Sequence, residues 1–275
     1  MPELPEIETV KLQLEKVLVG QVCKEIKILR DKVIKGEINE IIGREVQRIE
    51  RKGKVLIINF GPGLDLGFHF KMTGQLIYDD GKKRVVGGHP TEDFVNKMPS
   101  KHTRAIFTFD KGILYFNDQR MFGWIMLNPE FVDKLGPEPF EIEETKFIKI
   151  LSRLRKPVKI AIMDQEIISG VGNIYANDAC WEARINPRTP VNQLSVEQLS
   201  SLLDQIKLVL REGIKYGWAT AADAKYIDLH GLGGHYQEHF RTYNREGLPC
   251  LRCKTKIEKF VLGGRGTYYC PACQV

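Results

Sequence analysis

The chain has 275 residues, of which 43% are hydrophobic and 28% charged, enough apolar material for the cores of two domains. Its net charge of +6 at pH 7 is compatible with a polyanionic partner but does not prove one. No run of about 18 apolar residues occurs, which excludes a membrane-spanning helix. The N-terminus also lacks a basic segment followed by an apolar core, so we expect no secretory signal and a cytoplasmic protein.

The chain begins Met-Pro-Glu-Leu-Pro-Glu. A methionine before proline is normally removed, which would leave Pro2 with a secondary amine at the mature N-terminus. An α-amino group has a pKa near ~7.7–8.0, against ~10.4 for lysine, so much more of it is neutral at pH 7. A neutral amine can attack the sugar carbon of a nucleotide and form an iminium. Glu3 lies beside this amine, and Glu6 follows one helical turn later.

Apolar residues recur from Leu4 to Val17 with a period close to 3.6, which predicts an amphipathic helix. Prolines and glutamates are also common at ordinary helix starts, because proline fits the first turn and carboxylates suit the positive end of the helix dipole. This segment alone therefore leaves two interpretations open, a plain helix start and a catalytic N-terminus.

Short apolar segments separated by Gly, Asp and Lys turns follow the first helix. The predicted strands lie at 22–30, 45–60, 64–70, 75–78, 104–109, 113–117 and 124–127. Many short strands without intervening helices predict an antiparallel sandwich or barrel. We place this domain at residues 1–134 and interpret the Pro- and Gly-containing segment 135–142 as a linker.

The pattern becomes helical from residue 143. Ser195 and Gln198 form a capping box for a helix that runs to about Tyr216. The next segment, from about residue 219 to 240, has several glycines and no clear period. A loop of this length in a compact domain is usually functional.

A glycine pair precedes another predicted helix, in the segment Gly170-Val171-Gly172-Asn173. The glycines end one helix, and Asn173 can cap the next. Backbone N–H groups at such a helix start can hold a phosphate. A simple turn between two helices is the plainer interpretation of these residues alone.

Four cysteines occur as two Cys-x2-Cys pairs separated by sixteen residues: Cys250, Cys253, Cys270 and Cys273. This spacing predicts one structural Zn²⁺, because four thiolates complete a tetrahedral site and leave no position for water or substrate. Free thiols and a redox pair remain as alternatives. The sixteen residues between the pairs predict a β-hairpin. Cys23 and Cys180 lie outside the pattern and are predicted to be buried or free thiols.

Residues 241–275 carry seven Lys or Arg against two Glu, a density that suits phosphate contact, although a solvated basic tail would look the same.

Together these motifs resemble the bacterial formamidopyrimidine-DNA glycosylase family, whose members share the Met-Pro-Glu-Leu-Pro-Glu start. The resemblance implies that Pro2 is the nucleophile, Glu3 the acid/base residue and Glu6 a supporting carboxylate. It implies an α+β fold, with an N-terminal antiparallel β-sandwich that carries an N-terminal helix. A helix-two-turn-helix domain with a lesion-capping loop would follow at 143–240, and a four-cysteine zinc β-hairpin at 241–275.

The same resemblance implies a DNA-binding surface. Lys54 would contact phosphate and the damaged base, and Arg265 the phosphates flanking the flipped nucleotide. Further phosphate contacts are implied for His69, Lys159, Gly172 and Asn173. The residues that would fill the space left by the flipped nucleotide are Met72, Arg120 and Phe122. Without the resemblance, the two apolar residues among these could be core residues and the arginine a surface ion pair.

The predicted function is that of a bifunctional DNA glycosylase/AP lyase in base excision repair. It would act as a monomer on double-stranded DNA that contains an oxidised purine or an abasic site, and end in β,δ-elimination. Met121 stands where many relatives have a second arginine, which leaves opposite-base selectivity open. Two alternatives remain: an endonuclease VIII-type enzyme for oxidised pyrimidines, and a noncatalytic damaged-DNA-binding protein. Leu4, Met72 and the long capping segment favour the purine enzyme.

Overall fold

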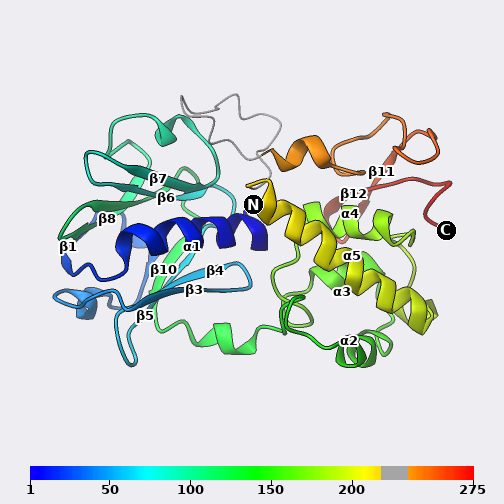
Figure 1. The fold of residues 1–275 in the computed structure, drawn as a ribbon, viewed down its shortest axis with the longest axis horizontal. Coiled ribbons are helices and arrows are strands. Elements are labelled where there is room, and N and C mark those ends of the chain that lie inside the picture. The colour runs from blue at the N-terminus through cyan, green and yellow to red at the C-terminus, as the bar shows by residue number, and fades with distance from the viewer. Residues whose placement is uncertain (218–234) are drawn as a thin grey trace. The chain divides into compact units, whose positions relative to one another are not determined.

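The computed structural model describes residues 1–217 and 235–275, and the chain forms two compact units (Figure 1). Among the described residues, one unit comprises Met1–Asp133 with Gly217 and His235, and the other comprises Lys134–Tyr216 with Tyr236–Val275. Most of the predicted lesion-capping segment lies outside the described residues. None of the described helices combines the length and the apolar character needed to cross a membrane.

The first unit begins with helix α1, Leu4–Leu18, as predicted. Glu3 is its N-cap residue and forms a capping box with Glu6, and a proline lies in its first turn. The apolar face of the helix is fully buried, through residues such as Leu4, Ile7 and Val10. The segment predicted as a possible catalytic N-terminus is therefore also a well-made helix start.

Two five-stranded sheets form the rest of this unit (Figure 1). One sheet has the order β1 (Cys23–Ile28), β8 (Thr103–Phe109), β9 (Ile113–Asp118), β6 (Gly74–Asp79) and β7 (Arg84–Gly88). The other has the order β2 (Ile34–Lys35), β10 (Trp124–Leu127), β5 (Asp65–His69), β4 (Val55–Asn59) and β3 (Arg48–Lys52). All pairs are antiparallel except β10 with β2. Aromatic side chains from both sheets meet in the core, where the rings of Phe68 and Phe107 lie 5.8 Å apart. The predicted β-sandwich with an N-terminal helix is confirmed.

The strands differ from the prediction in three places, one of which is the two-residue strand β2, which was not predicted. The predicted segment 45–60 is a hairpin of β3 and β4, whose strands meet at the Gly53–Lys54 turn. Strand β7 was not predicted, because only Val85 and Val86 in it are strongly strand-forming and two glycines follow. Gly88 has a φ of +106°, which favours glycine at that position.

Gly87 lets α1 approach β7 closely, since a Cβ there would lie 2.1 Å from Cγ2 of Val10. We expect Gly87→Ala to lower the free energy of unfolding by about 1–3 kcal/mol, because the helix must shift to admit the methyl group. Urea unfolding measures this loss. Adding Val10→Ala should relieve the overlap, so the double variant should lose less than the sum of the two single losses. Strictly additive losses would show that the two residues do not press on one another.

The second unit contains the helices α2 (Glu144–Leu151), α3 (Val158–Met163), α4 (Asn173–Glu182) and α5 (Val196–Lys215). The predicted capping box at the start of α5 is confirmed, with Ser195 as the N-cap. The hairpin of β11 (Glu258–Leu262) and β12 (Arg265–Tyr269) belongs to the same unit. Short 3-10 helices across the chain lie at Asp31–Val33, Asn39–Ile41, Glu92–Phe94, Glu130–Lys134, Val191–Gln193 and Tyr236–His239.

One predicted cap is wrong. Helix α4 begins at Asn173, and its N-cap is Gly172, with no capping bond from a side chain. The Asn173 side chain instead donates from Nδ2 to the carbonyl oxygen of Gly266 at 3.2 Å. The Asn173 side chain, predicted to cap α4, therefore bonds a residue 93 positions further along the chain.

Candidate functional site

The predicted nucleophile and acid/base residue lie at the start of α1. Pro2 is buried, and Glu3 is only 2% exposed. The backbone nitrogen of Glu3 donates to Oε2 of Glu6 at 2.6 Å, so the two carboxylates are fixed around the first helical turn. The fold therefore holds Glu3 next to Pro2 in an enclosed position, which suits proton transfer beside an amine nucleophile.

Lys54 lies in the β3–β4 turn and is also buried. Arg51 ties this turn to α1, because its Nε donates to Oε2 of Glu8 at 2.7 Å and its Nη1 donates to the carbonyl oxygen of Gly53 at 3.1 Å. Burial alone would raise the pKa of Glu8. The positive charges and hydrogen bonds of Arg51, and then of Lys11, outweigh burial, so the pKa of Glu8 lies below its usual value. The contact of Arg51 with Glu8 was not predicted, because the basic cluster around Arg51 is typical of a solvated turn.

His69 ends β5 close to three lysines. Burial, together with the positive charges of Lys71, Lys54 and Lys35, lowers the pKa of His69 to about 3. Its Nδ1 accepts a hydrogen bond from the backbone nitrogen of Lys71 at 3.0 Å, which places the proton of the neutral ring on Nε2. His69 is therefore a neutral donor, and any phosphate contact it makes would add a hydrogen bond without a charge.

The depressed pKa of His69 makes stability depend on pH. The unfolded state takes up a proton near pH 6.5, whereas the folded state resists it down to about pH 3. Stability is therefore fully present above pH 6.5 and falls as the pH drops through this window, by about 1–2 kcal/mol at pH 5. We expect His69→Asn to flatten this fall, as measured by urea unfolding at pH 7.5, 6 and 5. An unchanged pH dependence in the variant would assign the effect to other groups.

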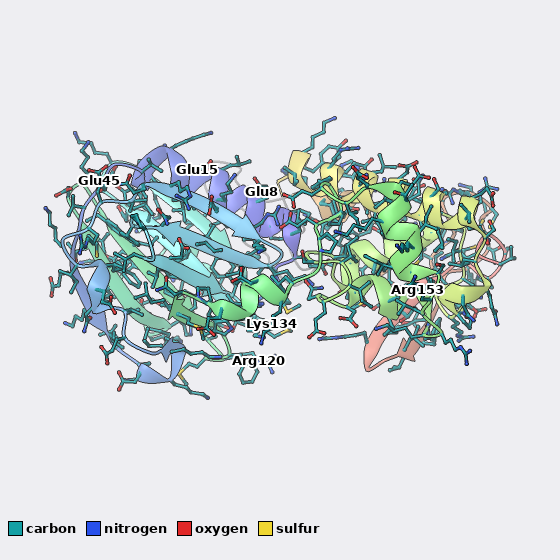
Figure 2. The ribbon with its side chains drawn as sticks, turned by 90° about the horizontal axis from the view of Figure 1, so that it is seen from below. Glu8, Glu15, Glu45, Arg120, Lys134 and Arg153 are labelled. Carbon is teal, nitrogen blue, oxygen red and sulfur yellow. The ribbon has the colours of Figure 1, made fainter. Side chains whose placement is uncertain are left out.

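The predicted void-filling residues lie on two loops of the first unit. Met72 is half-buried, whereas Arg120 and Phe122 are exposed. The guanidinium carbon of Arg120 lies 4.8 Å from the ring centre of Phe122, and Figure 2 shows Arg120 at the surface of this unit. Met121 has a φ of +53° and packs against the sandwich core. Met121 is therefore an apolar anchor for its loop.

Lys159 is fully buried in the second unit. Its Nζ donates to the carbonyl oxygen of Gly266 at 3.0 Å and to Oγ1 of Thr267 at 2.8 Å. Both acceptors directly follow Arg265 in β12, and Asn173 donates to the same Gly266 oxygen. The structure thus places this ammonium on the hairpin, while its predicted contact with phosphate stays a prediction.

Two neighbouring polar residues of α4 were not predicted as important. One bonds the β11–β12 hairpin, and the other bonds residues 241–243, which precede it. Oδ1 of Asn177 accepts from the backbone nitrogen of Tyr268 at 2.8 Å. Oδ1 of Asp178 accepts from the backbone nitrogens of residues 241–243 at 3.0–3.2 Å. Burial raises the pKa of Asp178 to about 6. An Asn-Asp pair inside a mostly apolar helix is the signal that could have found them.

The four predicted zinc ligands converge, with all Sγ atoms within 4.8 Å of one another. The Sγ atoms of Cys253 and Cys270 are 3.4 Å apart, and those of Cys250 and Cys273 are 3.9 Å apart. Tetrahedral zinc with bonds of about 2.3 Å requires sulfur separations near 3.8 Å, so this set fits one structural Zn²⁺. No other group of three potential ligands occurs among residues 1–217 and 235–275. Cys23 and Cys180 are buried, as predicted.

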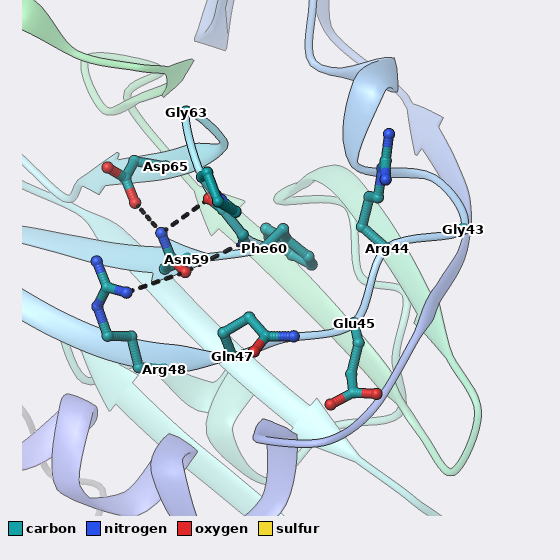
Figure 3. A pocket seen from close by; sticks show the side chains of 11 residues that line it. Gly43, Arg44, Glu45, Gln47, Arg48, Asn59, Phe60, Gly63 and Asp65 are labelled. Carbon is teal, nitrogen blue, oxygen red and sulfur yellow. Dashed lines mark hydrogen bonds between the residues drawn. The ribbon is translucent and has the colours of Figure 1, made fainter.

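A separate hollow of about 600 Å³ lies in the first unit, lined by residues 43–45, 47, 48, 59–63 and 65 (Figure 3). Its polar groups bond one another: Nη1 of Arg48 donates to Oδ1 of Asn59 at 3.4 Å, and Nδ2 of Asn59 donates to Oδ1 of Asp65 at 2.6 Å. None of the predicted site residues lines this hollow, and we assign it no function.

Three family models match the chain. They are the formamidopyrimidine-DNA glycosylase N-terminal domain over residues 1–125, the formamidopyrimidine-DNA glycosylase H2TH domain over 135–224, and the zinc finger found in FPG and IleRS over 247–275. Among curated proteins, the chain is 39% identical to the formamidopyrimidine-DNA glycosylase of Pelotomaculum thermopropionicum, across 100% of this chain and 99% of that protein. It is 36% identical to that of Ligilactobacillus salivarius, with the same coverage.

Solved structures also match the chain over 99% of its length. The Lactococcus lactis Fpg in complex with DNA containing an abasic site superposes with a TM-score of 0.84 at 31% identity, across 99% of each chain. The Thermus thermophilus MutM (Fpg) protein superposes with a TM-score of 0.85 at 32% identity, across 99% of this chain and 98% of that one. The L. lactis protein has also been solved with DNA containing an oxidized pyrimidine, and this structure matches with a TM-score of 0.84 at 31% identity across 99% of each chain.

Proposed function

This chain belongs to the formamidopyrimidine-DNA glycosylase family, and from that membership we propose that it excises oxidised purines from duplex DNA through a Schiff base on Pro2. It is a base-excision-repair DNA glycosylase with AP lyase activity. The observation that carries the residue assignment is the enclosed helix start, where Glu3 is fixed beside Pro2 by its capping box.

The chemistry follows from the two residues. After removal of Met1, the Pro2 amine attacks C1′ of the damaged nucleotide while Glu3 protonates the opening sugar oxygen, and the base leaves with the electrons of its glycosidic bond. The cationic iminium then acidifies the neighbouring sugar position. Loss of that proton expels the 3′-phosphate, and a second elimination expels the 5′-phosphate, which leaves a one-nucleotide gap with phosphate ends.

Basic and wedge residues would prepare this reaction. The damaged nucleotide must leave the base stack before Pro2 can reach its sugar. Lys54, Arg265 and the α4 start would bind phosphates, so we expect affinity to fall steeply with salt. Met72, Phe122 and Arg120 would fill the vacated space. We propose that the protein acts as a cytoplasmic monomer that is bound to the nucleoid through DNA.

Lys159 has a testable role within this scheme. We expect Lys159→Met to weaken binding of an abasic-site duplex roughly 10- to 100-fold, because the hairpin behind Arg265 loses two charged hydrogen bonds. Lys156→Met is the matched control, since its Nζ pairs with Asp164 at the surface, where both side chains are about one third exposed. Binding is measured over a range of salt concentrations. A positioning role leaves the salt slope unchanged, whereas a direct phosphate contact would lower it by about 1.

An oxidised pyrimidine is a second candidate substrate, favoured by the L. lactis Fpg complex with such DNA. Excision of an oxidised pyrimidine would leave the family assignment unchanged and would add a second class of lesion to the substrates. Parallel excision assays on 8-oxoguanine and thymine-glycol duplexes compare the two lesions directly.

Borohydride trapping tests the proposal. The purified protein, with loss of Met1 confirmed by mass spectrometry, is incubated with a duplex holding 8-oxoguanine opposite cytosine. We expect a covalent adduct that peptide mapping places on Pro2. If neither this duplex nor an abasic-site duplex gives an adduct, the catalytic assignment is wrong and a noncatalytic damaged-DNA binder becomes the better description.

A further inference from the structure

The proposed void-filling residues come from two different connections of the first unit. Residues 70–73 join β5 to β6 and carry Met72, whereas residues 119–123 join β9 to β10 and carry Arg120 and Phe122. Side chains that enter one gap in a duplex must keep a fixed spacing from each other. A structural element that links the two connections is therefore needed.

Asp118 links them. This residue ends β9 and is completely buried. Its Oδ1 accepts a short hydrogen bond from the hydroxyl of Thr73, the neighbour of Met72, and a second from the backbone nitrogen of Arg120 at 3.1 Å. Its Oδ2 accepts from the backbone nitrogen of Gly123 at 2.7 Å. A single carboxylate thus bonds both connections, on either side of the exposed Phe122.

The surrounding backbone holds Asp118 itself in place. Its nitrogen donates to the carbonyl oxygen of His102 at 2.9 Å, and its carbonyl oxygen accepts from Nε of Arg104 at 2.7 Å. Gly123 packs so closely that a Cβ there would lie 3.0 Å from both Oδ2 of Asp118 and the carbonyl oxygen of His69. The backbone nitrogen of Arg120 also donates to Oγ1 of Thr73 at 3.1 Å, so the two connections touch directly beside the enclosed carboxylate.

We propose that Asp118 is a positioning residue that joins the two connections into one rigid wedge, so that Met72, Arg120 and Phe122 enter the duplex together. The inference rests on the proposed function. Burying a carboxylate costs free energy unless hydrogen-bond donors surround it. Hydrogen bonds to an ionised acceptor are also stronger than bonds between neutral groups. Pre-set geometry matters because a misplacement of about 1 Å can slow a reaction about 100-fold.

Three substitutions separate this role from simple support of the fold. Asp118→Asn keeps the volume but turns one acceptor oxygen into an N–H donor. That donor then faces the backbone nitrogen of either Arg120 or Gly123, so the second connection loses one of its two bonds to residue 118. Thr73→Val removes the linking hydroxyl with little change of shape, and Thr73→Ser restores it. Asp93→Asn is the matched control, because Asp93 is also a buried carboxylate of this unit but bonds His102 and Asn117.

The assay uses two DNA substrates. The first is a duplex with 8-oxoguanine opposite the fluorescent cytosine analogue pyrrolocytosine, whose emission reports insertion of the wedge. The second is a single-stranded abasic oligonucleotide, which has no opposite base to replace. For Asp118→Asn and Thr73→Val we expect at least about tenfold slower insertion and excision on the duplex, with unchanged cleavage of the single strand. Thr73→Ser and Asp93→Asn should match the parent protein.

The double variant Asp118→Asn/Thr73→Val should be no slower than the slower single variant, because both remove the same link. Insertion at the parent rate in Thr73→Val would overturn the inference, even if Asp118→Asn failed to fold. An equal loss on both substrates would also overturn it, since Asp118 would then support the whole unit. Failure of the parent protein to excise or to be trapped would instead refute the proposed function, so the two failures are distinguishable.

Discussion

Replacing Glu3 with glutamine is expected to slow base excision by about 100- to 10,000-fold while duplex binding stays intact. Glutamine keeps an oxygen that can accept from the first helical turn, so the α1 start and its capping box survive. It cannot donate the proton that the opening sugar oxygen needs. Single-turnover excision on an 8-oxoguanine duplex measures the loss, and equilibrium binding to an uncleavable abasic analogue measures the affinity.

Glu15→Gln is the matched control for this experiment. Glu15 projects from the same helix (Figure 2), has a partly exposed side chain and pairs with Lys11 at 3.5 Å. Its replacement should leave both excision and binding unchanged. If Glu3→Gln loses binding along with excision, Glu3 is structural and the acid/base assignment is wrong.

Removal of zinc is expected to abolish duplex binding while the helices of the second unit remain folded. The apolar cluster under the hairpin is small and includes two of the ligands themselves, Cys250 and Cys270. Zinc binding in comparable peptides contributes about 10–16 kcal/mol of apparent free energy, far more than such a cluster can replace. Without the metal, the hairpin that presents Arg265 should lose its order.

Two variants make the zinc prediction specific. Cys253→Ala should not bind zinc, and its affinity for an abasic-site duplex should fall at least about 100-fold. Cys23→Ala changes a buried cysteine outside the zinc set, so its zinc content and its DNA affinity should stay unchanged. Zinc content and Trp181 fluorescence report the site, because Nε1 of Trp181 donates to Sγ of Cys250 at 3.4 Å. Full zinc content in Cys253→Ala, or unchanged DNA affinity in the metal-free protein, would contradict the prediction.

Several features could be predicted because their physics is local in the sequence. The spacing of Cys250 and Cys253, repeated at Cys270 and Cys273, defines a tetrahedral thiolate set before any fold is known. The capping box at Ser195 and the apolar period after Leu4 depend on residues three or four positions apart. The sandwich followed from many short strands without helices between them.

The starts of α1 and α5, the zinc ligands, the β-sandwich class and the family motifs could thus be recognised from the sequence. Which polar groups are enclosed, and what they bond, became visible in the tertiary structure. Lys159 bonds oxygens more than 100 positions away, Arg51 reaches Glu8 across 43 positions, and Asp118 reaches Thr73 across 45. Local patterning treats each of these as a surface charge or a turn residue, because the cost of burying a charge is removed only by partners that folding brings from elsewhere in the chain.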